Sequence, residues 1–460
     1  MNLQEYLHSI QDKTVAVIGI GVSNTPLLEL LAKSSISVTA CDKKERDALG
    51  ETADRLESMG VQLKLGPGYL RGLRQDIIFR TPGLRPDVPE LLEARERGSV
   101  ITSEMEVFFE VCPCPILAVS GSDGKTTTTT VISEFLKKEG KGVYVGGNIG
   151  HPLLAEAGQM RPEDVAVLEL SSFQLMTMNR SPHVAVLTNL APNHLDVHKD
   201  MAEYVAAKEN LFLHQSDDDL AVFNRDNKIT YELSKEARGR VRLFSRTCEL
   251  EEGVFLRGGA IVCRSGGTER EVLKTEDIFL PGVHNIENYM AAIAAVEGLV
   301  SDETIREVAR TFQGVEHRIE LVRTLRGVRY YNDSIASSPS RTIAGLRSFP
   351  EKVILIAGGY DKHIPFDVLG PEIVEHVKLL ILCGATADQI RAAVTGASNY
   401  RPGCPEMVEV HTLQEAVETA SNRAVSGDVV TLSPACAAFD QFPNFMVRGT
   451  AFKSIVNDLK

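Results

Sequence analysis

The stretch AVSGSDGKTTTTTVISEFL, residues 118–136, decides how the centre of this chain folds. It overlaps a short apolar run, ILAVS at 116–120, which is typical of a buried parallel strand. Gly121 and Gly124 permit backbone angles that a side chain would hinder, and we expect a helix from Thr126 onward. Free N–H groups at a helix start, the helix dipole and Lys125 all favour an anion. The stretch therefore predicts a phosphate-binding loop.

This loop is a shortened variant of the usual phosphate-loop pattern. The usual pattern has a further glycine five residues before Gly124, where this chain has Val119. Thr126 offers a hydroxyl suited to Mg²⁺. The alternative, a tight turn before a threonine-rich helix, leaves the lysine at the helix start unexplained.

Length and composition limit the class of protein. A chain of 460 residues predicts about three domains, at roughly 150 residues each. A net charge of −13 argues against a nucleic-acid surface. No apolar run reaches the roughly 18 residues of a membrane span, and the polar N-terminus lacks a signal-peptide layout. The eight scattered cysteines indicate reduced thiols rather than disulfides or zinc, so we expect a cytoplasmic protein.

Three blocks each restart an alternation of strands and helices, which predicts parallel, doubly wound sheets. We expect joints near Cys112–Pro115 and Gly314–Val315, and a small antiparallel insertion at 240–275. A helical stretch is expected at 286–312. The alternation runs through 14–24, 37–42, 76–83 and 98–109 in the first block and through 352–359, 379–384 and 428–435 in the third, and the expected strands of the second block include 116–120, 165–170, 184–190 and 220–224.

The first block contains a partial dinucleotide fingerprint. Gly19 and Gly21 follow a strand, Asn24 replaces the third glycine, and Asp42 ends the next strand. This pattern alone is weak evidence. NAD binding and binding of a nucleotide or sugar nucleotide at the same helix start both remain possible.

In the second block, polar residues follow the ends of expected strands. Glu169 lies where a Mg²⁺ ligand belongs beside a phosphate loop, although a surface glutamate is the alternative. His194, in NHLDVH, is a further candidate metal ligand. Asp200 and Glu203 predict a capping box at the start of a helix. Lys208 lies on that helix, and its residue type alone predicts a solvated lysine. Asn285 and Asn288 suit the edge of a base or serve as caps.

Nine runs, in one order, resemble the Mur ligase family over essentially the whole chain. LELSSFQL and the C-terminal SPA…FDQF…RG pattern favour members that act on D-glutamate, and the Asp-Asn-Pro triplet of diamino-acid-adding members is absent. The runs are GSDGKTTTT (121–129), GGNIG (146–150), LELSSFQL (168–175), NHLDVH (193–198), YVAAKENLF (204–212), HNIEN (284–288), HRIE (317–320), NDSIAS (332–337) and SPACAAFDQFPNF (433–445).

The resemblance implies an α/β fold of three domains with mostly parallel sheets flanked by helices. These are a Rossmann-like, UDP-sugar-binding domain at 1–112, a P-loop ATPase-like domain at 113–314 with the antiparallel insertion, and a Rossmann-like, amino-acid-binding domain at 315–460. It also implies a reaction in peptidoglycan precursor synthesis. ATP phosphorylates the carboxylate of UDP-MurNAc-L-alanine, and the amine of D-glutamate attacks the acyl phosphate. The implied enzyme is a monomer with two Mg²⁺ sites and no nucleic-acid or membrane partner.

The resemblance also implies roles for individual residues. Lys125, His194 and Lys208 are the implied catalytic residues, with Lys208 N-carbamylated. The implied metal ligands are Thr126, Glu169, His194 and Lys208. The implied ATP site comprises Ser122, Asp123, Gly124, Lys125, Thr126, Thr127, Thr128, Asn285, Asn288, Arg318 and Asp333. The implied UDP-substrate site comprises Gly19, Gly21, Val22, Ser23, Asn24, Asp42, Thr81, Pro82, Gly83 and Asn148, and the implied D-glutamate site Ser337, Lys362, Ala438 and Phe445.

The chain departs from the family pattern at three positions. Asp123 stands where asparagine is common, Ile335 where some members have lysine, and Ala438 where some have a serine that touches D-glutamate. A sister ligase with another amino-acid substrate therefore stays open. A non-catalytic nucleotide-binding or dehydrogenase-like protein is the alternative from a different class.

Overall fold

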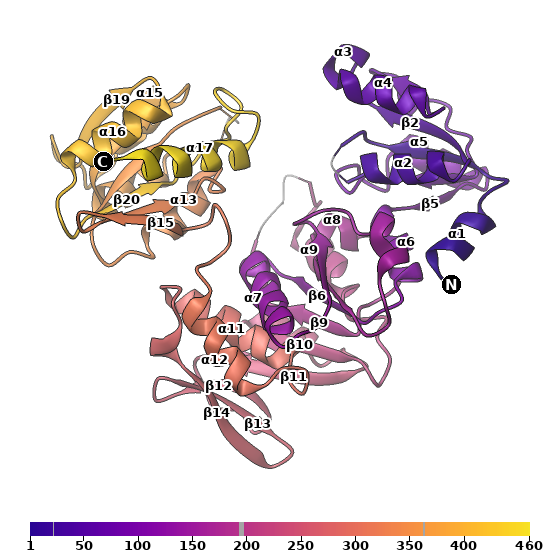
Figure 1. Cartoon of the computed structure of the whole chain (residues 1–460), viewed down its shortest axis with the longest axis horizontal. Helices are drawn as coiled ribbons and strands as arrows, with labels where there is room; N and C mark the ends of the chain where they lie inside the picture. Colours follow the sequence, from indigo (N-terminus) through magenta and orange to yellow (C-terminus); the bar gives the residue numbers. More distant parts are fainter. Residues whose placement is uncertain (22, 193–196, 362–363) are drawn as a thin grey trace. The chain divides into compact units, whose positions relative to one another are not determined.

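Three β-sheets organise the chain (Figure 1), as the three blocks of the sequence predict. The computed structural model describes residues 1–21, 23–192, 197–361 and 364–460. The described chain divides into two compact units. One comprises Met1–Ile278 with His284–Arg310, and the other Phe279–Val283 with Thr311–Lys460. The first two sheets share a unit, and the expected domain boundaries at 112/113 and 314/315 remain predictions.

The first sheet is wholly parallel, in the order β3-β2-β1-β4-β5. The strands β1, β2 and β4 lie in the regions predicted from their apolar runs. The strands are β1 (Thr14–Ile18), β2 (Ser37–Asp42), β3 (Gln62–Leu65), β4 (Ile77–Phe79) and β5 (Val100–Thr102). The helices are α1 (Leu3–Ser9), α2 (Thr25–Lys33), α3 (Arg46–Leu49), α4 (Glu51–Ser58), α5 (Pro89–Glu96) and α6 (Glu104–Val111).

The central sheet has the order β14-β13-β12-β11-β10-β9-β6-β8-β7 in the described chain, and α7 packs against β6, β7 and β8. Its strands are β6 (Ile116–Ser120), β7 (Val143–Gly147), β8 (Val165–Glu169), β9 (Val184–Leu187), β10 (Leu220–Asn224), β11 (Arg240–Ser245), β12 (Gly253–Arg257), β13 (Ala260–Ser265) and β14 (Thr268–Lys274). The helices are α7 (Lys125–Lys138), η1 (Leu154–Gln159), α8 (Ser172–Leu175), α9 (Met201–Glu209), α10 (Lys228–Leu233), η2 (Thr275–Asp277), α11 (Val283–Ala295) and α12 (Asp302–Thr311).

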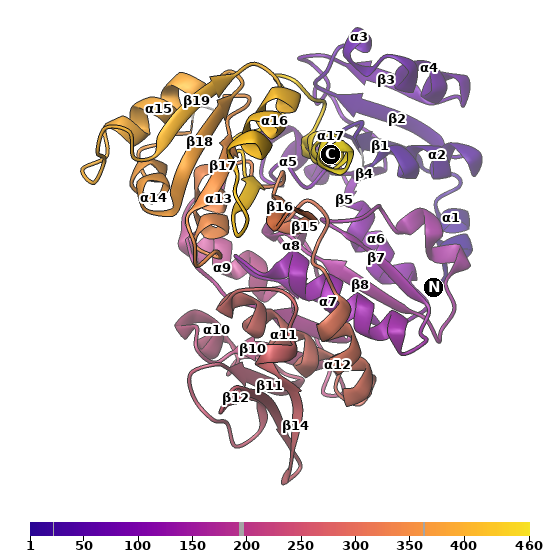
Figure 2. The ribbon, with the colours of Figure 1, turned by 60° about the vertical axis from the view of Figure 1, so that its left-hand side comes forward.

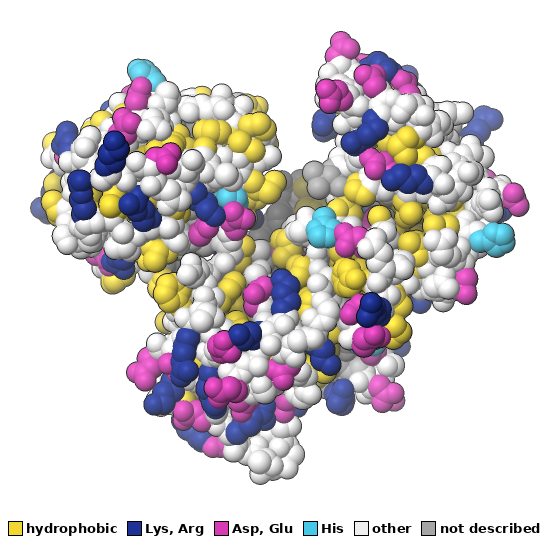
Figure 3. Space-filling model, viewed as in Figure 1, with side chains coloured by type: hydrophobic (Ala, Val, Ile, Leu, Met, Phe, Trp, Pro, Cys, Tyr) yellow, Lys and Arg dark blue, Asp and Glu magenta, His cyan; other side chains and the backbone are white. Residues whose placement is uncertain are grey.

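Two sequence predictions for this block need correction. The strands β12, β13 and β14 are antiparallel as expected, but β11 pairs in parallel with both neighbours, so the hairpins extend the central sheet itself (Figure 2). The expected helix at 286–312 is two helices, because the chain turns at Gly298, whose φ is +79°. On the face seen in Figure 3, Lys/Arg and Asp/Glu side chains are interspersed over β13, β14 and α12.

One hydrophobic core joins the first two sheets. It runs from Val17 and Phe79 of the first sheet through Phe108 of α6 to Ala118 and Leu168 of the central sheet. The helix α6 also packs against η1. Since these apolar side chains lose their contact with water together, the two sheets fold against each other as one unit.

The second unit holds a doubly wound sheet in the order β15-β16-β20-β17-β18-β19, in which, among the described strands, only the β15–β16 pair is antiparallel. Alternate residues of β17 enter two cores: Leu355 packs toward α13, α14 and α15, and Ile354 toward α16 and α17. The strands are β15 (Glu320–Leu325), β16 (Val328–Asn332), β17 (Val353–Ala357), β18 (Val377–Cys383), β19 (Glu406–Val410) and β20 (Val429–Leu432). The helices are α13 (Pro339–Leu346), α14 (Leu369–His376), α15 (Ala387–Thr395), α16 (Leu413–Arg423) and α17 (Phe445–Asp458).

Candidate functional site

The loop between β6 and α7 requires glycine at two positions. Gly121 has a φ of +146°, and a Cβ there would lie 2.0 Å from Thr188 Oγ1. Gly124 has a φ of +78°, and its Cβ would lie 2.4 Å from Asn288 Oδ1. The close approach of these neighbours, in addition to the backbone angles, explains the glycines that the sequence placed in a phosphate loop.

The end of β9 holds this loop in place. The Ser122 N–H donates to the Asn189 carbonyl at 2.9 Å, and the Asp123 N–H donates to Asn189 Oδ1 at 3.0 Å. Thr188 Oγ1 donates to the Asp123 carbonyl at 2.6 Å. The start of α7, which carries Thr127 and Thr128, is thereby fixed at the carboxyl edge of the central sheet.

Three implied ligand-binding residues meet beside the loop. Thr126 Oγ1 donates to one oxygen of the Glu169 carboxylate at 2.7 Å, and Asn148 Nδ2 donates to the other at 2.9 Å. Glu169 is 2% exposed at the end of β8, so the alternative of a surface glutamate is wrong. Lys125 Nζ lies on the loop itself and donates to the Gly121 and Ser122 carbonyls, each at 3.0 Å. Cationic and oxygen-rich groups are thus adjacent.

Lys208 is 1% exposed, so its interpretation as a solvated lysine is wrong. Its Nζ donates to Ser120 Oγ at 2.9 Å and to the Gly121 carbonyl at 3.0 Å, directly under the phosphate loop. Burial lowers the pKa of Lys208 well below its usual value, and the nearby Lys125 lowers it further while Glu169 opposes the shift. The sequence around Lys208 carries no local sign of this burial, because tertiary packing produces it.

The helix that carries Lys208 is tied to the first sheet. Asp200 caps α9 by accepting from the Glu203 N–H at 2.8 Å, but the expected reciprocal half of a capping box is not formed. Glu203 instead accepts from Arg85, at 2.8 and 3.0 Å, and from the Lys199 N–H at 2.7 Å. These hydrogen bonds lower the pKa of Glu203 to about 2. The ion pair connects the loop after β4 to the helix of Lys208.

Asn285 and Asn288 lie next to the phosphate loop. Asn288 Nδ2 donates to Asn285 Oδ1 at 3.1 Å, and Thr128 Oγ1 donates to Asn288 Oδ1 at 3.3 Å. Both side chains are buried inside α11 rather than ahead of its first residue, Val283, so they are not N-caps.

The implied UDP-substrate residues of the first sheet gather at its carboxyl edge. The Asp42 carboxylate accepts from the Ile20 and Lys44 N–H groups, at 2.6 and 2.8 Å. Asn24 Nδ2 donates to the Ile18 carbonyl at 2.8 Å, and a Cβ at Gly19 would lie 3.1 Å from Thr81 Cβ. Asp42 and Asn24 therefore shape the turn itself, a role that the dinucleotide fingerprint did not indicate.

A cavity in this unit lies beside that turn and was not predicted. Arg80, 1% exposed, donates to the carbonyls of Thr81 and Pro82, each at 3.2 Å, and so supports the Thr81–Gly83 loop. Burial raises the pKa of Glu104 to about 7. The cavity is lined by Ser23, Asn24, Arg80, Pro82, Ser103, Glu104, Met105, Gly147, Pro152 and Gln174. The sequence signal that could have indicated it is an arginine directly between an apolar strand and the Thr81–Gly83 loop.

In the second unit, Asp333 lies at the end of β16 and is 4% exposed. Ser433 Oγ donates to its carboxylate at 2.7 Å, and the Ile319 N–H donates at 3.3 Å. Burial raises the pKa of Asp333 to about 7, and nearby Arg318 is one of the groups that oppose this shift. The structure therefore places Arg318 close to Asp333.

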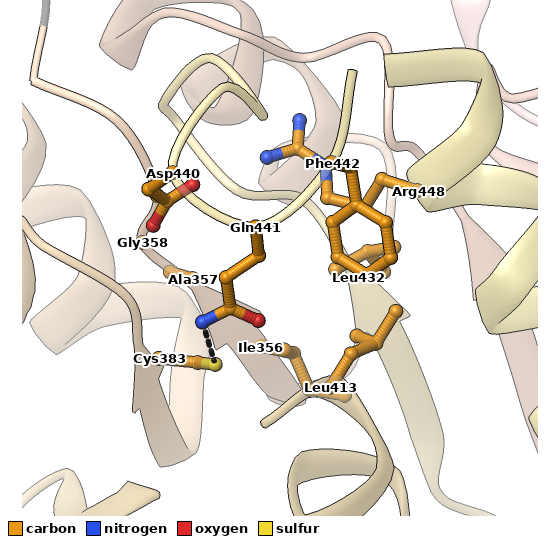
Figure 4. A pocket seen from close by; sticks show the side chains of 11 residues that line it. Ile356, Ala357, Gly358, Cys383, Leu413, Leu432, Asp440, Gln441, Phe442 and Arg448 are labelled. Atoms are coloured by element: carbon orange, nitrogen blue, oxygen red, sulfur yellow. Dashed lines mark hydrogen bonds between the residues drawn. The ribbon is translucent and has the colours of Figure 1, made fainter. Parts of the chain in front are cut away.

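Arg448, which the sequence analysis left unassigned, joins two loops at the same edge of this sheet. Its guanidinium donates to the carbonyls of Ser334, Cys436 and Ala437 at 2.9–3.1 Å. Ser334 Oγ in turn donates to the Phe445 carbonyl at 2.8 Å. Arg448 also lines a cavity in which Gln441 donates to Cys383 Sγ at 3.6 Å (Figure 4). The segments of Ser337, Ala438 and Phe445 are thus held near one another.

Three implied site residues, Val22, His194 and Lys362, lie outside the described residues. In the described part of the chain, no three His, Cys, Asp or Glu side chains form a metal cluster. No described helix is long and apolar enough to cross a bilayer.

Comparisons with known proteins identify relatives of this chain. Residues 119–296 match the Mur ligase middle domain, and residues 317–436 match the Mur ligase glutamate ligase domain. Two relatives are named UDP-N-acetylmuramoylalanine–D-glutamate ligase. The one from Acetivibrio thermocellus is 54% identical over 100% of this chain and 99% of its own, and the one from Clostridium novyi 52% over 99% of each.

Solved structures share the fold at low sequence identity. A UDP-N-acetylmuramate-alanine ligase from Thermotoga maritima has a TM-score of 0.61 at 18% identity, covering 97% of this chain and 100% of its own. A pseudomurein peptide ligase from Methanothermus fervidus has a TM-score of 0.53 at 17% identity, with the same coverage. With two domain models and full-length relatives in agreement, this chain is a member of the Mur ligase family of ATP-dependent ligases.

Proposed function

We propose that this enzyme joins D-glutamate to UDP-N-acetylmuramoyl-L-alanine, with ATP as the phosphoryl donor, in the cytoplasmic synthesis of peptidoglycan precursors. The relatives at 54% and 52% identity carry this activity in their names. The observation that carries the proposal is the grouping of Lys125, Thr126, Glu169 and Lys208 around one phosphate loop.

The reaction needs an activated carboxylate, because an oxide leaving group departs too slowly for an amine to displace it. In the proposed first step, a carboxylate oxygen of the sugar nucleotide attacks the γ-phosphorus of ATP and ADP leaves. In the second step, the amine of D-glutamate attacks the acyl phosphate, and phosphate leaves from a tetrahedral intermediate. Lys125 offsets the negative charge of the phosphates during both steps.

The donor set beside the loop suits Mg²⁺. Thr126 and Glu169 offer oxygen atoms, which Mg²⁺ prefers, within hydrogen-bonding distance of each other. When bound there, the ion would neutralise charge on the phosphates. We also propose that Lys208 is N-carbamylated. Burial lowers its pKa and so favours the neutral amine, which is the form that reacts with CO₂.

The remaining implied roles are part of the same proposal. Asn285 and Asn288, beside the phosphate loop, would contact adenine, and Arg318 and Asp333 would contact the nucleotide from the second unit. The turn of Gly19, Gly21, Ser23 and Asn24, with Thr81, Pro82 and Gly83, would hold the UDP part near Asn148. Ser337, Ala438 and Phe445 would form the D-glutamate pocket. Val22, His194 and Lys362 keep their implied roles as proposals, and the enzyme is proposed to act as a monomer.

Phosphate release tests this function directly. The purified protein, Mg²⁺-ATP and UDP-MurNAc-L-alanine are combined with D-glutamate, L-glutamate, L-alanine, glycine, L-lysine or meso-diaminopimelate. We expect release with D-glutamate alone. Release with another amino acid would assign a sister specificity and implicate Ile335 or Ala438. Absence of release with every amino acid would support a non-catalytic binding protein.

A further inference from the structure

Two thiols lie side by side where the chain passes from α6 to β6. Cys112 Sγ and Cys114 Sγ are 3.6 Å apart, and the same Cys112 sulfur lies 3.5 Å from the Cys114 carbonyl. Cys112 is half-buried and Cys114 is buried. We propose that this Cys-Pro-Cys pair is a redox site that closes to a reversible intrachain disulfide.

The two thiols differ in their tendency to ionise. The hydrogen bond from Cys112 lowers the pKa of the Cys114 thiol, whereas the same interaction and burial raise the pKa of Cys112. The two sulfur atoms are in contact, and the Cys114 thiol ionises more readily than the Cys112 thiol. Since the thiolate is the reactive species, this arrangement favours oxidation of the pair over that of an isolated buried thiol. A bond requires the sulfur atoms to approach to about 2.0 Å.

Hydrogen peroxide is a sufficient oxidant for this step. The thiolate sulfur attacks one peroxide oxygen, the O–O bond breaks, and a sulfenic acid and hydroxide form. The second sulfur then attacks the sulfenic sulfur and displaces its hydroxyl group as water, while its own proton and the first thiol's proton complete two water molecules. Both sulfur atoms are oxidised, and both peroxide oxygens are reduced.

The position of the pair predicts that this disulfide is easily reduced. A disulfide stabilises a fold mainly by closing a long loop of the unfolded chain. Residues 112–114 form a closed loop of only three residues, so this term is small. A bond that adds little to folding suits a regulatory role rather than a structural one, and strained or exposed disulfides are the easily reduced ones.

The surrounding hydrogen bonds determine which side of the pair must move. The Pro115 carbonyl accepts from the Ala166 N–H at 3.0 Å, and the Ile116 N–H donates to His183 Nδ1 at 3.1 Å. The chain is therefore anchored directly after Cys114. Closure displaces Cys112 and the last turn of α6, where the Cys112 N–H donates to the Phe108 carbonyl.

This displacement connects the redox site to the cavity of the first unit. Glu104 in the first turn of α6 and the preceding Ser103 line that cavity. We expect oxidation to raise KM for the sugar nucleotide several-fold and to leave KM for ATP nearly unchanged. This consequence rests on the proposed function, whereas formation of the disulfide does not.

Peptide mass measurement tests the redox site. The full-length protein is treated with hydrogen peroxide in the presence of a chelator, alkylated and cleaved with trypsin. Both thiols fall in the fragment 98–125, which contains no other cysteine. We expect this fragment to lose two hydrogen atoms and resist alkylation, and to regain two alkylation sites after dithiothreitol. Full alkylation after peroxide, or irreversible oxidation of one sulfur, would overturn the proposal.

Two variants sharpen the result. Cys248→Ser removes an exposed thiol elsewhere and should leave the disulfide in fragment 98–125 unchanged. Cys112→Ser should abolish it and leave kinetics insensitive to mild peroxide. A disulfide that forms without any change in KM would refute only the link to the cavity. If the protein had no ligase activity, the proposed function would be refuted, but the mass of fragment 98–125 would still test whether the disulfide forms.

Discussion

Lys208 holds its amine in a nearly water-free position, between Ser120, Gly121 and the ring of Tyr204, whose centroid is 5.0 Å away. An ammonium ion loses hydration there without gaining a carboxylate as a direct hydrogen-bond partner among those contacts, so the neutral amine is favoured. Carbamylation would exchange this amine for an anionic group next to Glu169 and the phosphate loop. A bound cation would then compensate two negative groups.

Replacement of Lys208 by methionine tests this role. Lys208→Met keeps most of the aliphatic volume and removes the amine, so the fold should persist while kcat falls by at least about 100-fold. Turnover at saturating Mg²⁺ and thermal unfolding are measured together. Lys137→Met, on the exposed face of α7, is the control and should retain activity. Wild-type turnover in the Lys208 variant would rule out the carbamate role.

Glu104 makes the stability of the protein depend on pH. Its pKa is raised from 4.5 to about 7 in the folded state by burial. Its contribution to stability is therefore fully present below about pH 4.5 and is lost as the pH rises through 7. The reason is that the carboxyl group ionises freely in the unfolded state, whereas burial opposes its ionisation in the folded state. The full shift corresponds to about 3 kcal/mol. The contribution of Glu104 to the free energy of unfolding therefore decreases between pH 5 and pH 8.

Glu104→Gln removes this titration and retains an acceptor for the Leu154 N–H, which donates to Glu104 at 2.9 Å. Relative to wild type, we expect the variant to be more stable at pH 8 than at pH 5 by up to about 3 kcal/mol. Urea unfolding at both pH values measures the difference. Glu110→Gln on the same helix is the control and should show no such change. An equal effect of Glu104→Gln at both pH values would contradict the buried, protonated state.

At the scale of secondary-structure elements, the sequence predicted the buried strands because ILAVS, VAVLE and VILIA are continuously apolar. It did not identify the polar edge strands β3 and β19, whose residues resemble loops. The residues of the candidate site likewise divide into those that the sequence identified and those that it did not. Lys125, Thr126 and Glu169 were identified because strand-end motifs are local. Arg80 and Arg448 were not assigned, because their burial and some of their carbonyl partners come from segments distant in the sequence.

Gly124→Ala separates backbone strain from steric collision in the phosphate loop. A positive φ costs about 1 kcal/mol at any non-glycine residue. Gly140, at the other end of α7, has a φ of +90° and open space around its Cβ position, whereas a Cβ at Gly124 would meet Asn288 Oδ1. Both variants should lose stability through the positive φ, and Gly124→Ala should lose more because of the collision. Only Gly124→Ala should raise KM for ATP, by at least about 10-fold, which is 1.4 kcal/mol. Equal KM values for ATP in the two variants would show that the Asn288 side chain moves aside without changing the loop.

At the scale of the whole molecule, the proposed reaction divides its groups between the two units. Lys125 and Thr126 belong to one unit, and Arg318 and Asp333 belong to the other. The chain passes between the units near Gly282, whose φ is +101°, and near Gly314, whose φ is +106°. Positions of this kind absorb the backbone rotations of a hinge. The sequence supported two joints in this chain, but local patterns contain no information on how units move.

We expect the two units to close on the nucleotide, since residues of both must reach one ATP molecule for the proposed reaction. Solution scattering should show a smaller radius of gyration with a non-hydrolysable ATP analogue, Mg²⁺ and the sugar nucleotide than without ligands. Lys125→Ala serves as the control, because loss of the phosphate-binding cation should prevent nucleotide-driven closure while the fold persists. Identical scattering of the wild type with and without saturating ligands would mean that Arg318 and Asp333 act without closure, or that they do not contact ATP.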